Sequence, residues 1–574
     1  MLPDHCAIVV VDGHAAMSGG DASSDSWTGP VADLAELVAK VERESKPRWV
    51  MFAAATVLPP LLARGVRLAR CHDIAEVHRL LVGGWRGDPH VAWAHVQGLA
   101  EDGLPRPPTG DLFEPEPEVG DPDEPTLASG YLRADVFTEW AVGSPDRVAR
   151  LADLALELAA RQVSFLRDVS ERAVRLAWSE SAAAALCAEL EHDGLPVDVP
   201  AALELVATAA GPRPVDPLDA GRIRRERDLR VLRHQPGREN TDLRNPAQVL
   251  QLLTSAGVMV DNTRKWALEP FRGTHPVVAD LLDWRRDERI ATTYGYHWLD
   301  SAVGPDGRLR GGWTACDGGG GRMTAQNGLH NLPALLRPAI AAEPGHVFVR
   351  ADLGQIEPRV LAAVSGDPAF AEATRADDLY APVAAKLGSD RATAKVAVLA
   401  AMYGQRSGAA GRALGDLERA YPVAMAYLDS AYREGVEGRS VRTFGGRLIR
   451  AGQPPDLADT GPAAEPTDPV VPESPGAAGG RGRYLRNAVI QGAAAELFKA
   501  WAATVRHVVA DLDGRIVLCL HDELFVHVPD RHAETCTTLV EQALTDSARR
   551  WAQSDRVRFV ADTSVIRRWS EAKA

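Results

Sequence analysis

The 574-residue sequence lacks the cysteine patterns of metal-binding or disulfide-stapled proteins. Its six cysteines are scattered, with no C-x-x-C pair and no histidine cluster at zinc spacing, which favours reduced and mostly buried thiols. Nothing near the N-terminus looks like a signal peptide, and we find no apolar stretch long enough to span a bilayer. We therefore expect a cytoplasmic protein that does not contact a membrane.

An excess of positive charge is missing too, since the net charge is −14. Binding to nucleic acids or polyphosphates requires local rather than total positive charge. The distribution of charge along the chain is therefore more informative than the net charge. Much of the acidity lies within 101–124, whereas the segment 222–238 is strongly basic. The chain is long enough for three or four domains, each with its own core.

The N-terminal residues, up to about 95, alternate β-rich runs with helical patterns, which indicates an α/β domain. The composition of 101–129 is that of a solvated linker. Helical spacing follows from Pro145 to about Val206. A strand–helix core resumes near Val347, and the Pro/Gly/Ala-rich stretch 453–482 predicts a mobile surface loop.

The first candidate acid is Asp352, which ends the apolar run 347–351. Helical spacing begins soon afterwards, and Pro358 is tolerable in the first turn of that helix. A carboxylate at the end of a strand is well placed to hold a metal in a cleft. Alternatively, Asp352 is only a helix cap and Glu357 a first-turn acid that compensates the helix dipole.

A second pair of acids separates two apolar β runs, 516–520 and 524–528. The intervening His521-Asp522-Glu523 predicts a tight hairpin with an imidazole and two carboxylates at its tip. Adjacent carboxylates repel each other unless a cation or solvent compensates them. A solvent-exposed polar turn is the alternative interpretation.

A predicted helix between these acids places Arg391, Lys395, Leu399 and Tyr403 at four-residue intervals, along one slowly drifting face. Gly404 could end this helix. Two cations one turn apart could hold a triphosphate. The alternative is a solvated basic face on an amphipathic helix.

Taken together and in this order, these residues resemble the three polymerase motifs of family A DNA polymerases, the Klenow-fragment type, and more loosely its actinobacterial members. The first motif is matched by Asp352, Gln355, Ile356, Glu357 and Arg359, the second by the helix from Arg391 to Gly404, and the third by His521-Asp522-Glu523. Asn487-x-x-x-Gln491-Gly and Arg322 match supporting elements of the family. The resemblance covers roughly residues 170–570.

The resemblance implies an α/β multidomain protein with a right-hand polymerase. We expect an RNase H-like, 3′–5′ exonuclease-type domain over 1–170. The thumb and the start of the palm would span 171–345. The palm and fingers would span 346–574 and include the flexible insertion near 453–482.

The implied activity is template-directed DNA synthesis in replication or repair, by a monomer that binds primer-template DNA and dNTPs. Two Mg²⁺ ions would be held by Asp352, Asp522 and the Leu353 carbonyl. Arg391 and Lys395 would clamp the triphosphate. Gln355, Glu357, Leu399 and Tyr403 would bind the nucleotide. Glu357 would be the steric gate, and Tyr403 would act at the templating position. DNA contacts fall on Arg322, Asn487, Gln491 and His521, with 222–238 gripping duplex phosphates.

The N-terminal region departs from the resemblance. The family's exonuclease site needs four carboxylates, but no Asp-x-Glu occurs around 9–12, the segment 52–56 carries no acid, and no Tyr-x-x-x-Asp occurs around 151–155. Asp73 is the only plausible survivor, so we expect a degenerate domain without proofreading activity. A catalytically weak DNA-binding scaffold stays open as an alternative function, whereas an RNase H-like nuclease would need the missing acids.

Leu399 replaces the aromatic residue usual at its position in the family. Leucine can pack against a base or sugar but cannot stack as a flat ring does, so we expect weaker or differently selective nucleotide binding. Leu399→Phe should lower the apparent Michaelis constant for the nucleotide in steady-state primer extension. An unchanged constant would remove this hypothesis.

Overall fold

The computed structural model describes residues 4–20, 26–106, 120–326, 328–404, 409–451 and 477–572. Contacts divide the chain into two compact units. Unit 1 contains Met1–Asp193, Gly312–Gln326 and Gly345–Val565, and unit 2 contains Gly194–Gly311, Asn327–Pro344 and Ile566–Ala574. The domain boundaries expected at residues 170 and 345 stay predictions. Within the described ranges, none of the helices combines the length and apolar character that a membrane-spanning segment needs.

The first sheet of unit 1 has the strand order β3-β2-β1-β4-β5. Its strands are β1 (His5–Val11), β2 (His14–Gly19), β3 (Trp27–Pro30), β4 (Arg48–Met51) and β5 (Arg70–Asp73). β1 pairs antiparallel with β2 and parallel with β4. The accompanying helices are α1 (Val31–Glu44), α2 (Ala54–Leu62), α3 (Ile74–Val82), α4 (Pro89–Gln97) and α5 (Pro145–Val169). The α/β interpretation of the N-terminal residues is thereby confirmed.

Apolar side chains of α5 build the core under this sheet. Leu151, Ala155 and Leu158 recur at three- and four-residue spacing and are buried with Val9 and Val50 of the strands. The next helix, α6 (Glu171–Asp193), is buried along much of its length. Helical structure over the segment that begins at residue 145 is therefore confirmed.

Asp73 is buried at the junction of β5 and α3. One carboxylate oxygen accepts the Glu76 N–H at 2.9 Å and the other accepts the Ala54 N–H at 2.6 Å. Burial and the neighbouring Glu76 raise the pKa of Asp73 to about 7. Both oxygens are thus used to cap helices inside the domain.

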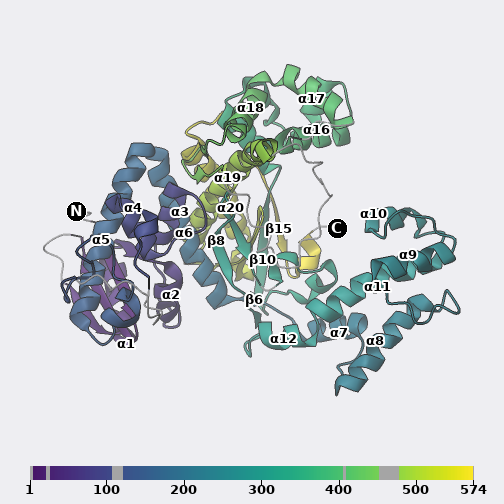
Figure 1. Ribbon diagram of the computed structural model, residues 1–574, viewed down its shortest axis with the longest axis horizontal. Coiled ribbons are helices and arrows are strands. Elements are labelled where there is room, and N and C mark those ends of the chain that lie inside the picture. Colours follow the sequence, from purple (N-terminus) through teal and green to yellow (C-terminus); the bar gives the residue numbers. More distant parts are fainter. Residues whose placement is uncertain are drawn as a thin grey trace. The chain divides into compact units, whose positions relative to one another are not determined.

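The second sheet of unit 1 has the order β13-β14-β10-β15. Its strands are β10 (His346–Leu353), β13 (Arg515–Leu520), β14 (Glu523–Pro529) and β15 (Ala561–Ile566), and a separate ribbon pairs β8 (Trp313–Asp317) with β9 (Arg322–Ala325). Two helices, α19 (Ala477–Val508) and α20 (Ala533–Ala552), pack against each other beside the second sheet (Figure 1). The predicted strand before Asp352 and the hairpin around Asp522 are confirmed.

A helical subassembly follows β10 and has its own apolar core, which includes Phe370, Leu379 and Tyr421. Its helices are α13 (Ile356–Ser365), α14 (Pro368–Ala373), α15 (Tyr380–Leu387), α16 (Arg391–Tyr403), α17 (Ala409–Ala420) and α18 (Pro422–Val436). A short ribbon of β11 (Val441–Arg442) and β12 (Leu448–Ile449) comes after them. The predicted helix over 391–403 is confirmed, and Gly404 ends it with a φ of 71°.

The loop predicted over 453–482 is wrong in its last part. Residues 477–482 form the first turns of α19, while 452–476 lie outside the described residues. A Cβ added at Gly435 of α18 would lie 2.6 Å from the Arg481 carbonyl oxygen and 2.8 Å from the Gly482 Cα. Glycines let the two helices approach closely, and this tertiary packing outweighs the low helix propensity of the segment.

Unit 2 is mainly helical. Its elements are α7 (Val199–Ala210), α8 (Pro217–Leu232), α9 (Pro246–Ser255), α10 (Lys265–Leu268), α11 (Pro276–Thr293), α12 (Tyr296–Ala302), β6 (Leu195–Pro196) and β7 (Arg308–Leu309). Leu252, Val278 and Leu281 lie in its core.

The basic segment 222–238 lies mostly on α8. Several of its arginines bind acids within unit 2, such as Arg227, which pairs with Glu288 at 2.8 Å. Arg224, Arg225 and Arg238 are exposed and form no ion pair among the described residues. Only part of the predicted basic patch is therefore available to an external anion.

Candidate active site

Strand register brings the predicted acids together. β10 and β14 are antiparallel, with Asp352 opposite Glu523. The Leu353 N–H donates to the Asp522 carbonyl at 2.9 Å, so the hairpin turn lies directly beside the end of β10. His521 has a φ of 55°, a left-handed conformation that lets the chain reverse between β13 and β14.

Asp352 lies within β10, whereas Gln355 occupies the N-cap position of α13 without a capping bond from its side chain. The alternative that Asp352 merely caps this helix is therefore wrong. Pro358 lies in the first turn of α13, as predicted. The carboxylate of Asp352 is 22% exposed, which leaves it accessible at the end of its strand.

Arg350 is a buried cation among these acids, with only 2% of its side chain exposed. Its guanidinium binds Asp352 at 2.7 Å and Asp562 at 3.2 Å, and it also pairs with Glu523. Sequence reasoning missed this residue. The available signal was a charged residue inside the otherwise apolar run 347–351, where strand alternation places Arg350 on the same face as Asp352.

Asp522 carries the clearest electrostatic signature of the site. Burial, followed by the charge of Asp352, raises its pKa to about 6. Such a shift arises when carboxylates converge in a partly desolvated place. A bound cation would relieve it, and carboxylate oxygens are preferred ligands of Mg²⁺. The residues present therefore fit a divalent metal ion held by Asp352 and Asp522.

A cavity of about 210 Å³ opens next to this acidic cluster. Six of the predicted site residues line it: Arg322, Gln355, Glu357, Gln491, His521 and Asp522. They come from β9, the first turn of α13, α19 and the hairpin turn. Because these elements are far apart in the sequence, the cavity is a product of the tertiary fold. Burial raises the pKa of Glu357.

The wall formed by α19 is well anchored. Lys499 is fully buried, pairs with Glu180 of α6, and donates to the Gly321 carbonyl at 2.6 Å. This bond fixes the backbone immediately before Arg322, whose Nη2 donates to Gln491 Oε1 at 3.3 Å. One turn earlier on the helix, Asn487 has a buried Oδ1 with no hydrogen-bond partner. An unmet acceptor of this kind is available to a ligand.

Asp378 connects two predicted residues and was itself missed. Gln355 Nε2 donates to Asp378 Oδ1 at 2.9 Å, and Gln355 Oε1 accepts the Leu379 N–H at 2.8 Å. Arg391 pairs with the other Asp378 oxygen at 2.5 Å. In this structure the first cation of α16 is thus held by an acid rather than left free for an anion.

The other predicted residues of α16 differ in exposure. Lys395 is exposed and forms no ion pair among the residues that the structure describes. Leu399 is half-buried against the apolar core of the α13–α18 subassembly. Tyr403 is 44% exposed at the end of the helix. None of these three lines the 210 Å³ cavity.

Comparisons with known proteins agree with this geometry. The model of DNA polymerase family A matches residues 238–571. DNA polymerase I of Chloroflexus aurantiacus is 29% identical over 310 residues, which are 48% of this chain and 31% of that protein. DNA polymerase I of Deinococcus radiodurans is 25% identical over 455 residues, 73% of this chain and 44% of that protein. The chain spans less than half the length of these curated relatives.

Among solved structures, the POL domain of Pol1 from M. smegmatis, in complex with DNA primer-template and dNTP, matches with a TM-score of 0.67. The match covers 99% of this chain and 95% of that chain at 20% identity, which shows a shared fold. The family model covers more than half of the chain and includes both acidic motifs. By these matches and the site's geometry, the chain belongs to DNA polymerase family A.

Proposed function

We propose that this protein is a template-directed DNA polymerase that adds dNTPs to a primer 3′-hydroxyl, in DNA replication or repair. The observation that carries the proposal is the convergence of Asp352 and Asp522 beside a cavity that Gln355, Glu357 and Gln491 help to line. No single motif brings these groups together. The likeness to a polymerase solved with primer-template and dNTP supports the same assignment.

Asp352 and Asp522 would hold two Mg²⁺ ions, with the Leu353 carbonyl as a further ligand. Such ions activate the attacking hydroxyl and neutralise the triphosphate and the departing pyrophosphate. Arg350 keeps the acids of three strands at a fixed spacing, since it binds one acid each on β10, β14 and β15. The protein's part in phosphoryl transfer is then positioning and charge compensation.

The cations of α16 would receive the triphosphate. Arg391 would exchange Asp378 for phosphate oxygens, and Lys395 is already exposed one turn along the helix. Glu357 would act as the steric gate against a ribose 2′-hydroxyl, with Gln355 and Leu399 nearby. Tyr403 would lie at the templating position. Arg322, Asn487, Gln491 and His521 would contact the primer or template.

The parts of a right hand follow from these roles. The β13-β14-β10-β15 sheet with α19 and α20 would be the palm, and α13–α18 the fingers. The helices of unit 2 would be the thumb. Arg224, Arg225 and Arg238 there are the candidates for contacts with duplex phosphates. The first sheet would be an RNase H-like domain without proofreading activity.

The central test is extension of a labelled primer on a DNA template with Mg²⁺ and dNTPs. Asp522→Ala should lower the extension rate by roughly a thousandfold or more, because losing a metal ligand removes several kcal/mol of transition-state stabilisation. Asp555→Ala, which changes an exposed acid outside the site, should behave as wild type. Wild-type protein that binds primer-template but does not extend it, in Mg²⁺ or Mn²⁺, would instead support a DNA-binding scaffold.

The absence of proofreading has its own test. A labelled single strand incubated with Mg²⁺ and without nucleotides should keep its full length, because Asp73 uses both carboxylate oxygens for backbone bonds. Asp73→Asn is the suitable variant, since the amide oxygen can still accept one of the two backbone N–H groups and cap a helix. If the wild-type protein shortens the strand and this variant does not, the proposal is contradicted.

Arg350 offers a test independent of activity. Arg350→Ala leaves Asp352, Glu523 and Asp562 to repel one another, so in EDTA the variant should lose about 3 kcal/mol of stability or more. Excess Mg²⁺ should then raise its unfolding temperature more than that of wild type, because metal replaces the missing cation. Arg64→Ala, at an exposed arginine elsewhere, is the control. Equal increments in all three proteins would count against a metal at these acids.

A further inference from the structure

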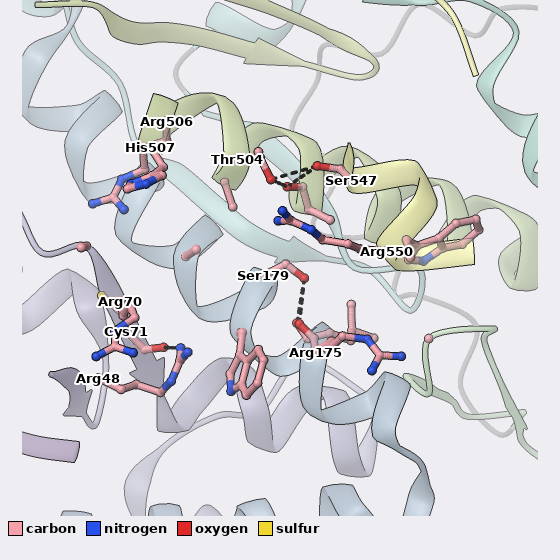
Figure 2. Close-up of a pocket in the computed structure, with 18 of the residues that line it drawn as sticks. Arg48, Arg70, Cys71, Arg175, Ser179, Thr504, Arg506, His507, Ser547 and Arg550 are labelled. Atoms are coloured by element: carbon pink, nitrogen blue, oxygen red, sulfur yellow. Dashed lines mark hydrogen bonds between the residues drawn. The ribbon is translucent and has the colours of Figure 1, made fainter. Parts of the chain in front are cut away.

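A second cavity, of about 390 Å³, lies within unit 1 and shares no lining residue with the candidate active site. Its walls come from β4, β5, α6, α19 and α20. Figure 2 shows arginines placed around it, with Arg48 and Arg70 from the first sheet on one side and Arg175 and Arg550 on the other. Neither the polymerase motifs nor the proposed reaction uses this cavity.

The lining of this cavity is strongly cationic in a chain of net charge −14. It contains no aspartate or glutamate and six arginines: Arg48, Arg70, Arg172, Arg175, Arg506 and Arg550. Within the described part of the chain, Arg506 is the only one of the six with a carboxylate partner, Glu189 at 2.7 Å. The other five guanidinium groups have no carboxylate counter-ion among the described residues, so the cavity favours an anion.

Two of these arginines have buried nitrogens that make no hydrogen bond, Nε of Arg172 and Nη2 of Arg175. Buried donors without acceptors are uncommon, because they lose their bonds to water without replacement. Burial, and then the charge of Arg70, also lower the pKa of Arg48 to about 10. An anionic ligand with several acceptor oxygens would satisfy the donors and stabilise the charged arginines.

The rest of the lining is apolar and aromatic. Leu176, Ala182 and Ala500 provide apolar contacts, and Trp178 is 42% exposed. The Arg48 guanidinium lies over the Trp178 ring at 4.6 Å. Tryptophan faces and arginine planes are the surfaces on which nucleobases stack. The lining therefore fits a ligand with a flat ring at one end and negative charge at the other.

We propose that this cavity binds a nucleoside diphosphate or triphosphate, separately from the nucleotide consumed in primer extension. Its phosphates would lie among Arg172, Arg175 and Arg550, and its base against Trp178. The volume is in the range of sites for small molecules of this size. The ligand would also contact α19, the helix that contributes Gln491 to the candidate active site.

The test is isothermal titration of ADP into the full chain, in EDTA and without primer-template. We expect one ADP bound per chain. Arg550→Glu and Trp178→Ala should each weaken binding by about tenfold or more, through loss of a charge-assisted contact or of base stacking. Arg64→Glu, the same charge reversal at an exposed arginine elsewhere, should leave the affinity unchanged. Thermal unfolding establishes that each variant is folded.

Absence of ADP binding, or equal affinity in Arg550→Glu and Arg64→Glu, would overturn the proposal. Inorganic pyrophosphate that binds as tightly as ADP would overturn the role of the base. A single-stranded oligonucleotide could instead bind where ADP does not, with an affinity that Arg550→Glu and Trp178→Ala weaken. That result would overturn the proposal of a small nucleotide and identify nucleic acid as the ligand. Because the assay contains neither divalent metal nor primer-template, its outcome is independent of polymerase activity.

Discussion

Carboxylates at the ends of β10 and β14 repel one another, and the buried guanidinium of Arg350 offsets this repulsion within the protein. The arrangement of the candidate site depends on that balance. Strand register places Asp352 beside Glu523, and the turn adds Asp522, whose pKa is raised by burial and then by the charge of Asp352. A guanidinium with donors in a fixed fork can bind three acids at once.

Buried cations also join separate segments elsewhere in unit 1. Lys499 joins Glu180 to the backbone before Arg322. Arg359 donates to five backbone carbonyls around the start of α13, including that of Gly354 at 3.0 Å. These bonds hold loop segments whose backbone groups are not paired in a helix or sheet. A buried charged group is costly unless it is hydrogen-bonded in this way. The cavity lined by Trp178 differs, because most of its arginines form no ion pair within the part of the chain that the structure describes.

Asp73 has a structural role at the edge of the first sheet. Its carboxylate oxygens cap helices, and the sheet packs against α6 through buried residues such as Ser181, which accepts the Asp73 N–H. The opposite ends of β4 and β5 contribute Arg48 and Arg70 to the cationic cavity. Residues of the first sheet thus form part of the wall of the cationic cavity.

Local patterns in the sequence were sufficient for the strand before Asp352, the hairpin around Asp522 and the helix from Arg391 to Tyr403, because the period of apolar residues and the turn chemistry act over a few residues. The three motifs and their order were sufficient to identify the family. Tertiary structure alone decided that Arg350 neutralises the acids, that Asp378 holds Arg391, and that residues 477–482 are helical. It also decided which arginines lack partners. These contacts join residues of different helices and strands, such as Arg350 and Glu523 at a separation of 173 positions, and no local period encodes them.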